Sequence, residues 1–211
     1  PLYTAAELEH QLRDSGAEVI VVLENFAATV QQVLDKVKLR HVVVTRAGDL
    51  LGFPTGPFIN FVLKYVQRRI AYWSMPGATM LAEALTACAA LSMKPATLGH
   101  EDIAFLQYTG GTTGVAKGAM LTHGNLVANL EQCYAWFSQV GLERATYVCA
   151  LPLYHIFSLT ANCLLFTAIG GTGLLITNPR DFRGFIKQLR KHPPMFFMGV
   201  NTLFNALMNT P

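Results

Sequence analysis

Charged residues are scarce in this sequence of 211 residues: Asp, Glu, Lys and Arg together make up 14%, where a soluble domain carries roughly 25%. Hydrophobic residues make up 52%, which excludes an intrinsically disordered chain. The formal net charge is only +3 and no cluster of Lys and Arg dominates a segment, so nothing favours a nucleic-acid partner. The 17 glycines and 10 prolines are scattered, which excludes collagen-like and low-complexity chains.

Cysteine is also rare, with four residues and no CxxC spacing. The sequence therefore indicates neither a disulfide scaffold nor a zinc site, and we expect reduced, buried thiols in a cytosolic protein. The cysteines are Cys88, Cys133, Cys149 and Cys163. The sequence shows no basic and apolar signal-peptide pattern. Pro1 and Pro211 both look like cuts within a longer protein, so we expect an internal piece.

Long apolar runs are missing as well. Acidic and basic residues are absent from Ala145 through Pro179, a length that could suggest a membrane span. Pro152, His155 and Asn162 interrupt this stretch, and its gap-free apolar runs are far shorter than about 18 residues. A strand, a helix and a second strand buried in a parallel sheet explain the stretch better.

The hydrophobic periodicity alternates between the strand and the helix repeat along most of the chain. This predicts an α/β fold, a mainly parallel sheet flanked by helices. Expected strands are 19–23, 42–44, 104–108, 147–151, 174–177 and 195–198. Expected helices are one that stops at Gly16, then 26–37, 58–73, 122–137, 157–169, 182–190 and 202–208. We divide the chain into an αβ unit (1–50), an insertion-like loop and helix region (51–100) and an αβ core (101–211).

The expected helix 58–73 is basic and rich in aromatic residues, and no acid occurs from Leu50 to Ala82. Helical spacing places its polar residues on one face, and the aromatic residues occupy the rest. Two interpretations stay open: an ordinary surface helix that packs its apolar side on the sheet, or a helix that lies on an anionic membrane. The polar residues are Asn60, Lys64, Gln67 and Arg68.

The most informative segment runs from Tyr108 to Gly118 and reads Tyr-Thr-Gly-Gly-Thr-Thr-Gly-Val-Ala-Lys-Gly. We expect it to follow a strand and to precede a helix. Glycines let the backbone approach a ligand, threonine hydroxyls donate to phosphate oxygens, and Lys117 adds a positive charge. The segment is not the P-loop of nucleoside triphosphatases, which needs Gly-Lys-Ser/Thr, because Ala116 precedes Lys117 and Gly118 follows it. It is not a dinucleotide fingerprint either, because the GxGxxG spacing is absent. Its composition predicts a phosphate-binding loop.

The same segment resembles the phosphate-binding signature of the adenylate-forming superfamily, which includes acyl-CoA synthetases, firefly luciferase and nonribosomal adenylation domains. The usual pattern is Tyr-Thr-Ser-Gly-Thr-Thr-Gly-x-Pro-Lys-Gly. Gly110 stands where Ser is usual, which removes one hydroxyl donor, and Ala116 stands where Pro is usual, which removes a fixed φ. Both departures are typical of the bacterial long-chain fatty acyl-CoA ligases, which this chain resembles most closely.

Further segments extend the resemblance over nearly the whole chain. The run Leu151–Phe157 is similar to the second core motif of these ligases, whose His and aromatic residue border the acyl pocket and the thiol channel. The resemblance therefore implies a catalytic role for His155 and Lys117, and a substrate pocket lined by His155 and Phe157. It implies that the nucleotide-binding residues are Tyr108, Thr109, Gly110, Gly111, Thr112, Thr113, Gly114, Lys117 and Gly118. Softer matches are 1–4, 177–181 and 199–207.

The resemblance also implies the reaction. The fatty acid attacks the α-phosphate of ATP to give an acyl-adenylate and pyrophosphate, and the thiol of coenzyme A then displaces AMP. Mg²⁺ should bridge the phosphates, with its carboxylate ligand outside this sequence. The expected partners are ATP, a fatty acid and coenzyme A. The chain would be part of the large N-terminal domain, without the C-terminal domain, and we expect the 211 residues alone to be inactive.

Alternatives remain at this point. Within the superfamily, the substrate could be an aryl or medium-chain acid. Outside it, the chain could be a phosphate-binding enzyme of another class, such as a kinase, or a non-catalytic, membrane-associating, acyl-binding module built around 58–73. We expect a cytoplasmic location, with peripheral contact to the inner face of the cytoplasmic membrane as an option. A homodimer is also an option, because an incomplete domain leaves apolar sheet surface exposed.

Overall fold

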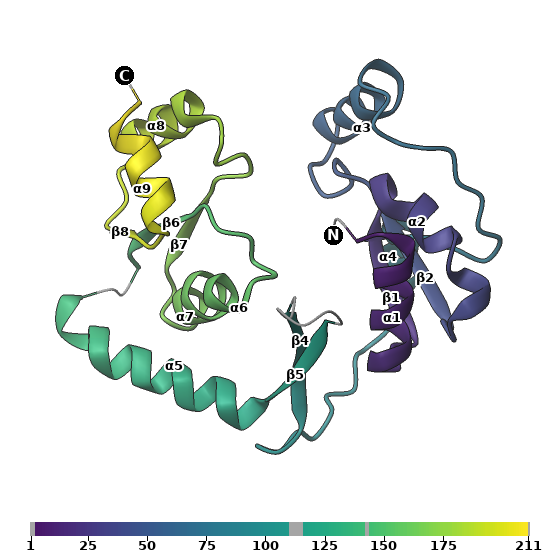
Figure 1. Cartoon of the computed structure of the whole chain (residues 1–211), viewed down its shortest axis with the longest axis horizontal. Coiled ribbons are helices and arrows are strands. Elements are labelled where there is room, and N and C mark those ends of the chain that lie inside the picture. The colour runs from purple at the N-terminus through teal and green to yellow at the C-terminus, as the bar shows by residue number, and fades with distance from the viewer. Residues whose placement is uncertain (1–2, 110–115, 142–143, 211) are drawn as a thin grey trace. The chain divides into compact units, whose positions relative to one another are not determined.

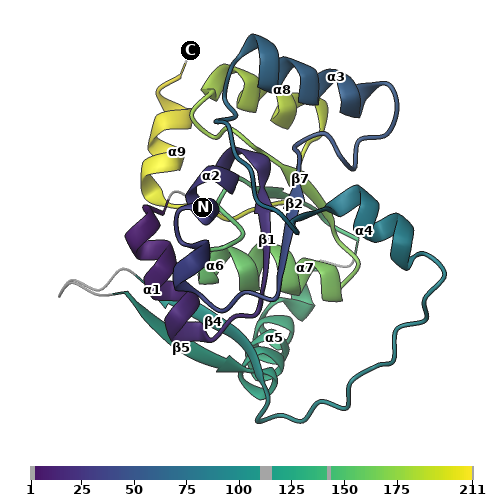
Figure 2. The ribbon, with the colours of Figure 1, turned by 90° about the vertical axis from the view of Figure 1, so that its right-hand side faces the viewer.

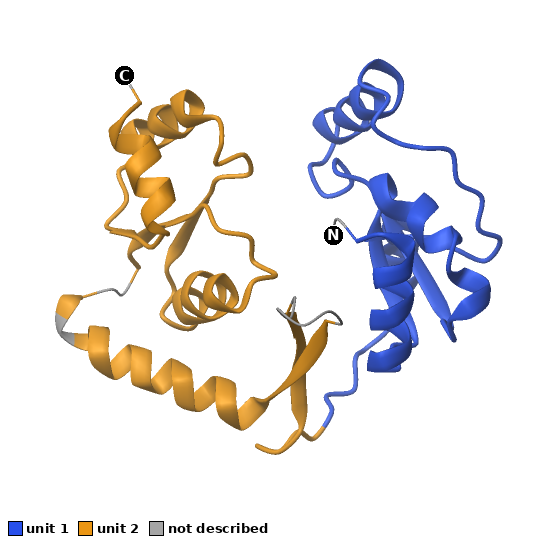
Figure 3. Cartoon of the chain, viewed as in Figure 1, with its two compact units in different colours: residues 1–96 blue, residues 97–211 orange. Residues whose placement is uncertain are grey.

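The computed structural model describes residues 3–109, 116–141 and 144–210, and it forms two compact units, 1–96 and 97–211 (Figure 3). The first unit contains a parallel sheet in the order β1-β2-β3, with helices before and after the strands (Figure 1). Its elements are α1 (Ala5–Ser15), β1 (Val19–Leu23), η1 (Glu24–Phe26), α2 (Ala27–Gln31), η2 (Leu34–Lys36), β2 (His41–Thr45), α3 (Thr55–Phe61), η3 (Val62–Val66), β3 (Thr79–Met80) and α4 (Leu81–Cys88).

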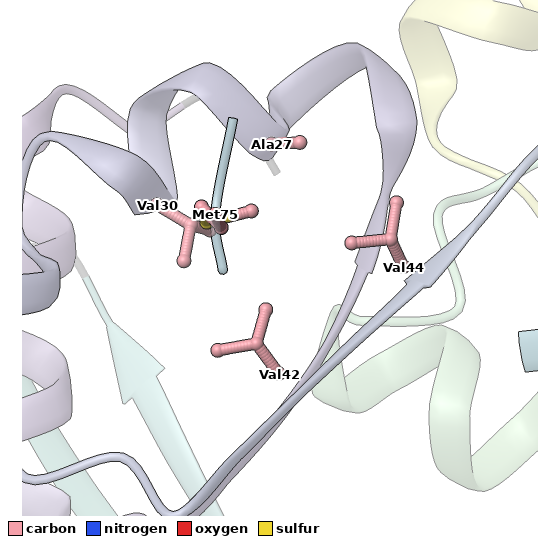
Figure 4. Packing of buried hydrophobic residues seen from close by; sticks show 5 residues of the cluster. All are labelled: Ala27, Val30, Val42, Val44 and Met75. Carbon is pink, nitrogen blue, oxygen red and sulfur yellow. The ribbon is translucent and has the colours of Figure 1, made fainter. Parts of the chain in front are cut away.

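One face of this sheet forms the core of the first unit. Val42 and Val44 project from β2 toward Ala27 and Val30 of α2, and Met75 completes the cluster (Figure 4). All five are buried, because alternate residues of a strand point to the same face. On β1 the other set of alternate side chains is exposed: Val19, Val21 and Leu23.

A buried charge lies at the end of β1. Glu24 of η1 is only 3% exposed, and its carboxylate accepts a hydrogen bond from Nε of Arg46 at 3.1 Å. Nζ of Lys64 lies 3.8 Å from the other carboxylate oxygen. A buried carboxylate needs such partners, since burial otherwise disfavours its charged form.

The helical structure around Lys64 differs from the expected helix 58–73. It begins at Thr55, continues as a π-helix over Val62–Val66 and ends there. Arg68 has a φ of 49°, which no helix can continue. Similarly, the single helix expected over 26–37 is divided into the short elements η1, α2 and η2.

The second unit contains two separate sheets. Strands β7, β6 and β8 form a parallel sheet in that order. Strand β4 pairs with β5 in an antiparallel ribbon (Figure 2). The elements are β4 (Ile103–Thr109), β5 (Lys117–Thr122), α5 (His123–Phe137), η4 (Ser138–Val140), β6 (Thr146–Cys149), α6 (Ile156–Ser158), η5 (Leu159–Leu164), α7 (Leu165–Ala168), β7 (Thr172–Leu175), α8 (Phe182–Lys191), β8 (Phe196–Phe197) and α9 (Asn201–Met208).

The stretch without charges, Ala145–Pro179, forms β6, the consecutive helices α6, η5 and α7, and β7. Because β6 and β7 run parallel, the helical segment is the crossover between them. Val148, Leu165 and Phe166 are buried, as the sequence predicts for the middle of a sheet. Within the described ranges, no helix is both long and apolar enough to cross a membrane.

The parallel strands and their flanking helices confirm the predicted α/β class. The expectation of four buried thiols is wrong at Cys88, which is exposed at the end of α4, whereas Cys149 is buried on β6. All four cysteines are free.

Candidate functional site

The predicted phosphate-binding motif connects two antiparallel strands. Thr109, the last residue of β4, lies opposite Lys117, the first residue of β5, and Tyr108 lies opposite Gly118. Lys117 and Gly118 belong to a strand that the sequence did not predict, and the expected helix 122–137 follows that strand. The helix begins only at His123, where the Thr122 side chain accepts a hydrogen bond from N of Asn125 at 3.1 Å.

The N-terminal cap of α5 is a reciprocal one. Oδ1 of Asn125 accepts a hydrogen bond from N of Thr122 at 3.1 Å, so Asn performs the role that Glu or Gln has in the usual capping box. This cap fixes the point at which β5 ends and α5 begins.

Five of the predicted phosphate-binding residues, Gly110 to Gly114, lie outside the described residues. The residues that flank them are described. Thr109 and Lys117 are both exposed at the ends of the two strands, and in the part of the chain that the structure describes no acid forms an ion pair with Lys117. A hydroxyl and an ammonium group facing each other across a strand pair are chemically suited to bind phosphate oxygens.

Tyr108 lies directly over Gly118. A Cβ placed on Gly118 would be 2.9 Å from Cζ of Tyr108, closer than a carbon atom normally approaches a ring. Gly118 is therefore required for the position of this ring and not for an unusual backbone angle. The two predicted residues form a packed pair next to the motif.

His155 begins the helical crossover of the parallel sheet. Its Nδ1 accepts a hydrogen bond from N of Phe157 at 3.3 Å, and its carbonyl oxygen accepts one from N of Leu159 at 2.8 Å. His155 is exposed, and Phe157 is 43% exposed. Neither side chain is a core residue, so both are available to a ligand.

The structure connects the two motifs by one hydrogen bond. Nε2 of Gln107, on β4 next to Tyr108, donates to the carbonyl oxygen of Tyr154, next to His155, at 3.0 Å. Motifs 47 residues apart in the sequence are therefore adjacent in the second unit. Gln107 is therefore a candidate site residue that the sequence did not indicate, because no local pattern distinguishes it from the other residues of β4.

The sequence also did not predict the hydrogen bonds of Ser158 and Asn162. Oγ of Ser158 donates to the carbonyl oxygen of Leu151 at 3.0 Å, and Nδ2 of Asn162 donates to Oγ of Ser158 at 3.2 Å. Both side chains are fully buried. They fasten the start of the loop Leu151–His155 to the helix that follows it. Their spacing of four residues within an uncharged stretch is the signal that could have found them.

Two side chains on β6, the strand that precedes this loop, have raised pKa values. Burial raises the pKa of the Cys149 thiol, and a hydrogen bond involving Ser158 opposes this in part. Burial also raises the pKa of Tyr147, whose ring stacks on Phe166 at 4.0 Å between centroids. Both groups therefore stay protonated at neutral pH.

The described side chains do not form a metal site. In the ranges 3–109, 116–141 and 144–210, no group of three or more His, Cys, Asp and Glu side chains could hold a metal ion. The donor set at Thr109 and Lys117 suits a phosphate group instead.

A family model described as "AMP-binding enzyme" matches residues 1–211, the whole sequence. The chain belongs to this family. The resemblance inferred from the motifs at 108–118 and 151–157 is thereby confirmed.

Relatives of this AMP-binding chain include long-chain-fatty-acid–CoA ligases. Those of Escherichia coli O157:H7 and Haemophilus influenzae are 54% and 50% identical to it over 212 and 213 residues. Each match includes 99% of this chain but only 37% and 38% of the relative. The chain therefore spans a little over one third of the length of the curated relatives it matches.

Solved structures agree on the fold. A long-chain-fatty-acid-CoA ligase from Archaeoglobus fulgidus matches with a TM-score of 0.68 and 26% identity, over 100% of this chain and 35% of that one. ATP-bound MatB from Rhodopseudomonas palustris also matches with a TM-score of 0.68, at 24% identity and with the same coverage. The α/β chain is thus a partial domain of the adenylate-forming fold.

Proposed function

We propose that this chain is part of a long-chain fatty acid–CoA ligase. The full-length protein activates a fatty acid with ATP to an acyl-adenylate and then transfers the acyl group to coenzyme A. The observation that carries the proposal is the hydrogen bond between Gln107 and Tyr154, because it holds a phosphate-binding motif against a motif expected at the acyl pocket. The identity of 54% to a long-chain-fatty-acid–CoA ligase supports the same substrate class.

In this proposal the β4–β5 pair binds the triphosphate. Lys117 and Thr109 bind the phosphate oxygens from opposite strands, together with the residues Gly110 to Gly114 between them. Tyr108 and Gly118 hold the two strands in register next to the motif. The contribution of these groups to the first step is charge neutralisation and positioning, which dominate phosphate-centred reactions.

His155 has a defined hydrogen-bonding state in this proposal. Its Nδ1 accepts the N–H of Phe157, so a neutral ring carries its proton on Nε2. Nε2–H can then donate to a carboxylate or an adenylate oxygen. Phe157, exposed beside it, supplies apolar surface for the acyl chain. This pair would line the substrate pocket.

Mg²⁺ and coenzyme A complete the proposed reaction. Because the described residues provide no carboxylate cluster, we expect the magnesium ligand elsewhere in the longer protein. Mg²⁺ neutralises phosphate charge when it is bound. Coenzyme A acts as the second substrate.

The test is acid-dependent exchange of pyrophosphate into ATP by the purified full-length protein. Long-chain, medium-chain and aryl acids are compared in parallel, followed by consumption of the coenzyme A thiol. We expect exchange and thiol consumption with long-chain acids, and less of both with the other two classes. Release of ADP instead of pyrophosphate would indicate a kinase and would overturn the proposal.

A further inference from the structure

Two polar side chains are fully buried within the apolar crossover between β6 and β7. Ser158 and Asn162 are both 0% exposed, in a helical segment whose Leu165 and Phe166 are also buried. A buried polar group lowers the stability of a core unless its hydrogen bonds are satisfied, and apolar side chains would fill these positions without that cost. The contacts of Ser158 and Asn162 therefore indicate what the two residues do.

These contacts form a chain of hydrogen bonds that ends at the carbonyl oxygen of Leu151. Nδ2 of Asn162 donates to Oγ of Ser158 at 3.2 Å, and Oγ of Ser158 donates to the Leu151 oxygen at 3.0 Å. Sγ of Cys149 lies 3.8 Å from the same oxygen. Because Oγ of Ser158 accepts from Asn162, its single hydrogen is directed to Leu151. The chain of hydrogen bonds thus fixes the first residue of the loop Leu151–His155.

His155 lies at the other end of this loop. N of His155 donates to the carbonyl oxygen of Pro152 at 3.0 Å, and N of Leu159 donates to the carbonyl oxygen of His155 at 2.8 Å. The hydrogen bond between Ser158 and Leu151 joins residues seven positions apart and closes the backbone around His155. Because His155 is exposed, core packing does not hold its ring, so the position of the ring depends on these hydrogen bonds.

The helix that contains Asn162 has an unusual form. Residues Leu159–Leu164 form a π-helix between the α-helices α6 and α7. Such wide turns are rare and occur frequently at functional sites. Among the described residues, Oδ1 of Asn162 has no hydrogen-bond partner, although this atom is buried. An unpaired buried acceptor costs stability, so the presence of Asn162 is explained by the hydroxyl that it orients and not by a gain in stability.

We propose that Ser158 and Asn162 are positioning residues for adenylation, which hold the Leu151–His155 loop so that His155 stays in place beside the reacting carboxylate. This inference rests on the proposed function and adds to it two buried residues that act through His155. Loss of the Ser158 hydroxyl should therefore lower kcat. It should leave the KM for ATP unchanged, because Lys117 and Thr109 belong to the β4–β5 pair.

The test is a double-mutant cycle in the full-length protein, measured by pyrophosphate exchange with a long-chain fatty acid. Ser158→Ala should lower kcat about tenfold to 100-fold, because a small displacement of a group at the reacting atoms has an effect of this size. In the His155→Ala background the same change should have almost no further effect, since a residue that acts only through His155 has nothing left to position. Ser158→Thr retains the hydroxyl and should keep most of the kcat of the parent protein.

The controls separate positioning from stability. Asn162→Ala removes the group that orients the hydroxyl and should lower kcat as Ser158→Ala does. Ser138→Ala is the matched control, because it also removes a hydroxyl that donates to a carbonyl oxygen, that of Ala135 at 3.0 Å, directly after α5. Its kcat should equal that of the parent. Val30→Ala removes two methyl groups from the core of the first unit and should lower the melting temperature with kcat unchanged.

Two outcomes would overturn this inference while the proposed function stands. The first is an equal loss of kcat from Ser158→Ala in the parent and in the His155→Ala background. The second is a kcat that follows the melting temperature through all variants, Val30→Ala included. If Ser158→Ala does not fold, Ser158→Cys replaces it in the cycle, because a thiol of similar size is only a weak donor. A parent without acid-dependent exchange would overturn the proposed function and this inference with it.

Discussion

The ring of Tyr108 occupies the space that a side chain on Gly118 would need. The two residues are directly opposite each other in the β4–β5 pair. A second pair of the same kind exists in the parallel sheet, where a Cβ on Gly173 would lie 2.7 Å from the hydroxyl oxygen of Tyr147. The first tyrosine is partly exposed and the second is buried against Phe166, so the two glycines offer a controlled comparison.

We expect Gly118→Ala and Gly173→Ala to differ in their effects. In Gly118→Ala the Tyr108 ring can move outward, so the loss of unfolding free energy should be about 1 kcal/mol. In Gly173→Ala the Tyr147 ring has no such freedom, and the loss should approach 3 kcal/mol. Urea unfolding of the full-length variants measures both. Pyrophosphate exchange should fall more in Gly118→Ala, and the opposite order would contradict the placement of the site.

Lys117→Ala should slow adenylation about 100-fold, because a preorganised charge at a phosphate is lost. Fatty acid binding should change much less, since the acyl pocket is expected at His155 and Phe157. Pyrophosphate exchange and equilibrium binding of a fluorescent fatty acid measure the two separately. Lys117→Arg retains the charge and should recover part of the rate. Unchanged pyrophosphate exchange in Lys117→Ala would reject the assigned role.

Glu24→Gln should lower the free energy of unfolding by about 1 to 2 kcal/mol. The change removes a buried carboxylate and leaves Arg46 and Lys64 without their partner; the cost stays below that of a fully buried pair because both cations are partly exposed. Glu18→Gln breaks the exposed pair with Arg40 and should cost about 0 to 1 kcal/mol. Equal losses in the two variants, measured by urea unfolding, would contradict the buried position of Glu24.

Cys149 and Cys88 should differ in reactivity toward maleimides. Burial shields the Cys149 thiol and raises its pKa, which lowers its thiolate fraction, whereas Cys88 is exposed. We expect Cys88 to be labelled about tenfold faster or more in the folded protein, as peptide mass spectrometry can measure, and the difference to vanish in urea. Similar rates in the folded state would show that β6 is more open than described.

The same thiol predicts a dependence of stability on pH. Because the folded-state pKa of Cys149 is raised, the unfolded chain loses this proton at a lower pH than the folded one. The stabilisation is therefore complete at neutral pH and is lost as the pH rises above about 8.5. The free energy of unfolding, measured at increasing pH, should decline less steeply for Cys149→Ala than for the parent protein. An identical pH dependence of the two proteins would refute the assignment.

Much of the fold could be predicted because its strands are rich in β-branched residues. The run at His41–Thr45 has a buried face, the run at Val19–Leu23 packs the partly buried Ile20 and Val22 against the same core, and the uncharged stretch at Ala145–Pro179 matches the centre of a sheet. In contrast, β5 reads Lys-Gly-Ala-Met-Leu-Thr and shows neither alternation nor β-branched enrichment. Pairing with β4 makes it a strand, and tertiary pairing leaves little trace in a local pattern.

The residues of the candidate site could be predicted from their motifs, but the way in which the two motifs lie next to each other could not. The residues at Tyr108–Gly118 and Leu151–Phe157 carry recognisable patterns, whereas the hydrogen bond from Gln107 to Tyr154 joins positions that no local rule connects. The orientation of the helical segment 55–66, which places Lys64 beside the buried carboxylate of Glu24, was equally hidden. Hydrophobic periodicity alone assigns polar residues to the outside.

The ladder between β4 and β5 sets a rule for which sequence changes this protein tolerates. An insertion or deletion between Thr109 and Lys117 changes the length of the connection between the two strands and leaves their pairing unchanged. A one-residue insertion within either strand would instead shift the pairing and turn Gln107, Tyr108 and their neighbours to the opposite side of the ribbon. We therefore expect variation in length to be confined to the tip of this ribbon, while its arms keep a constant number of residues.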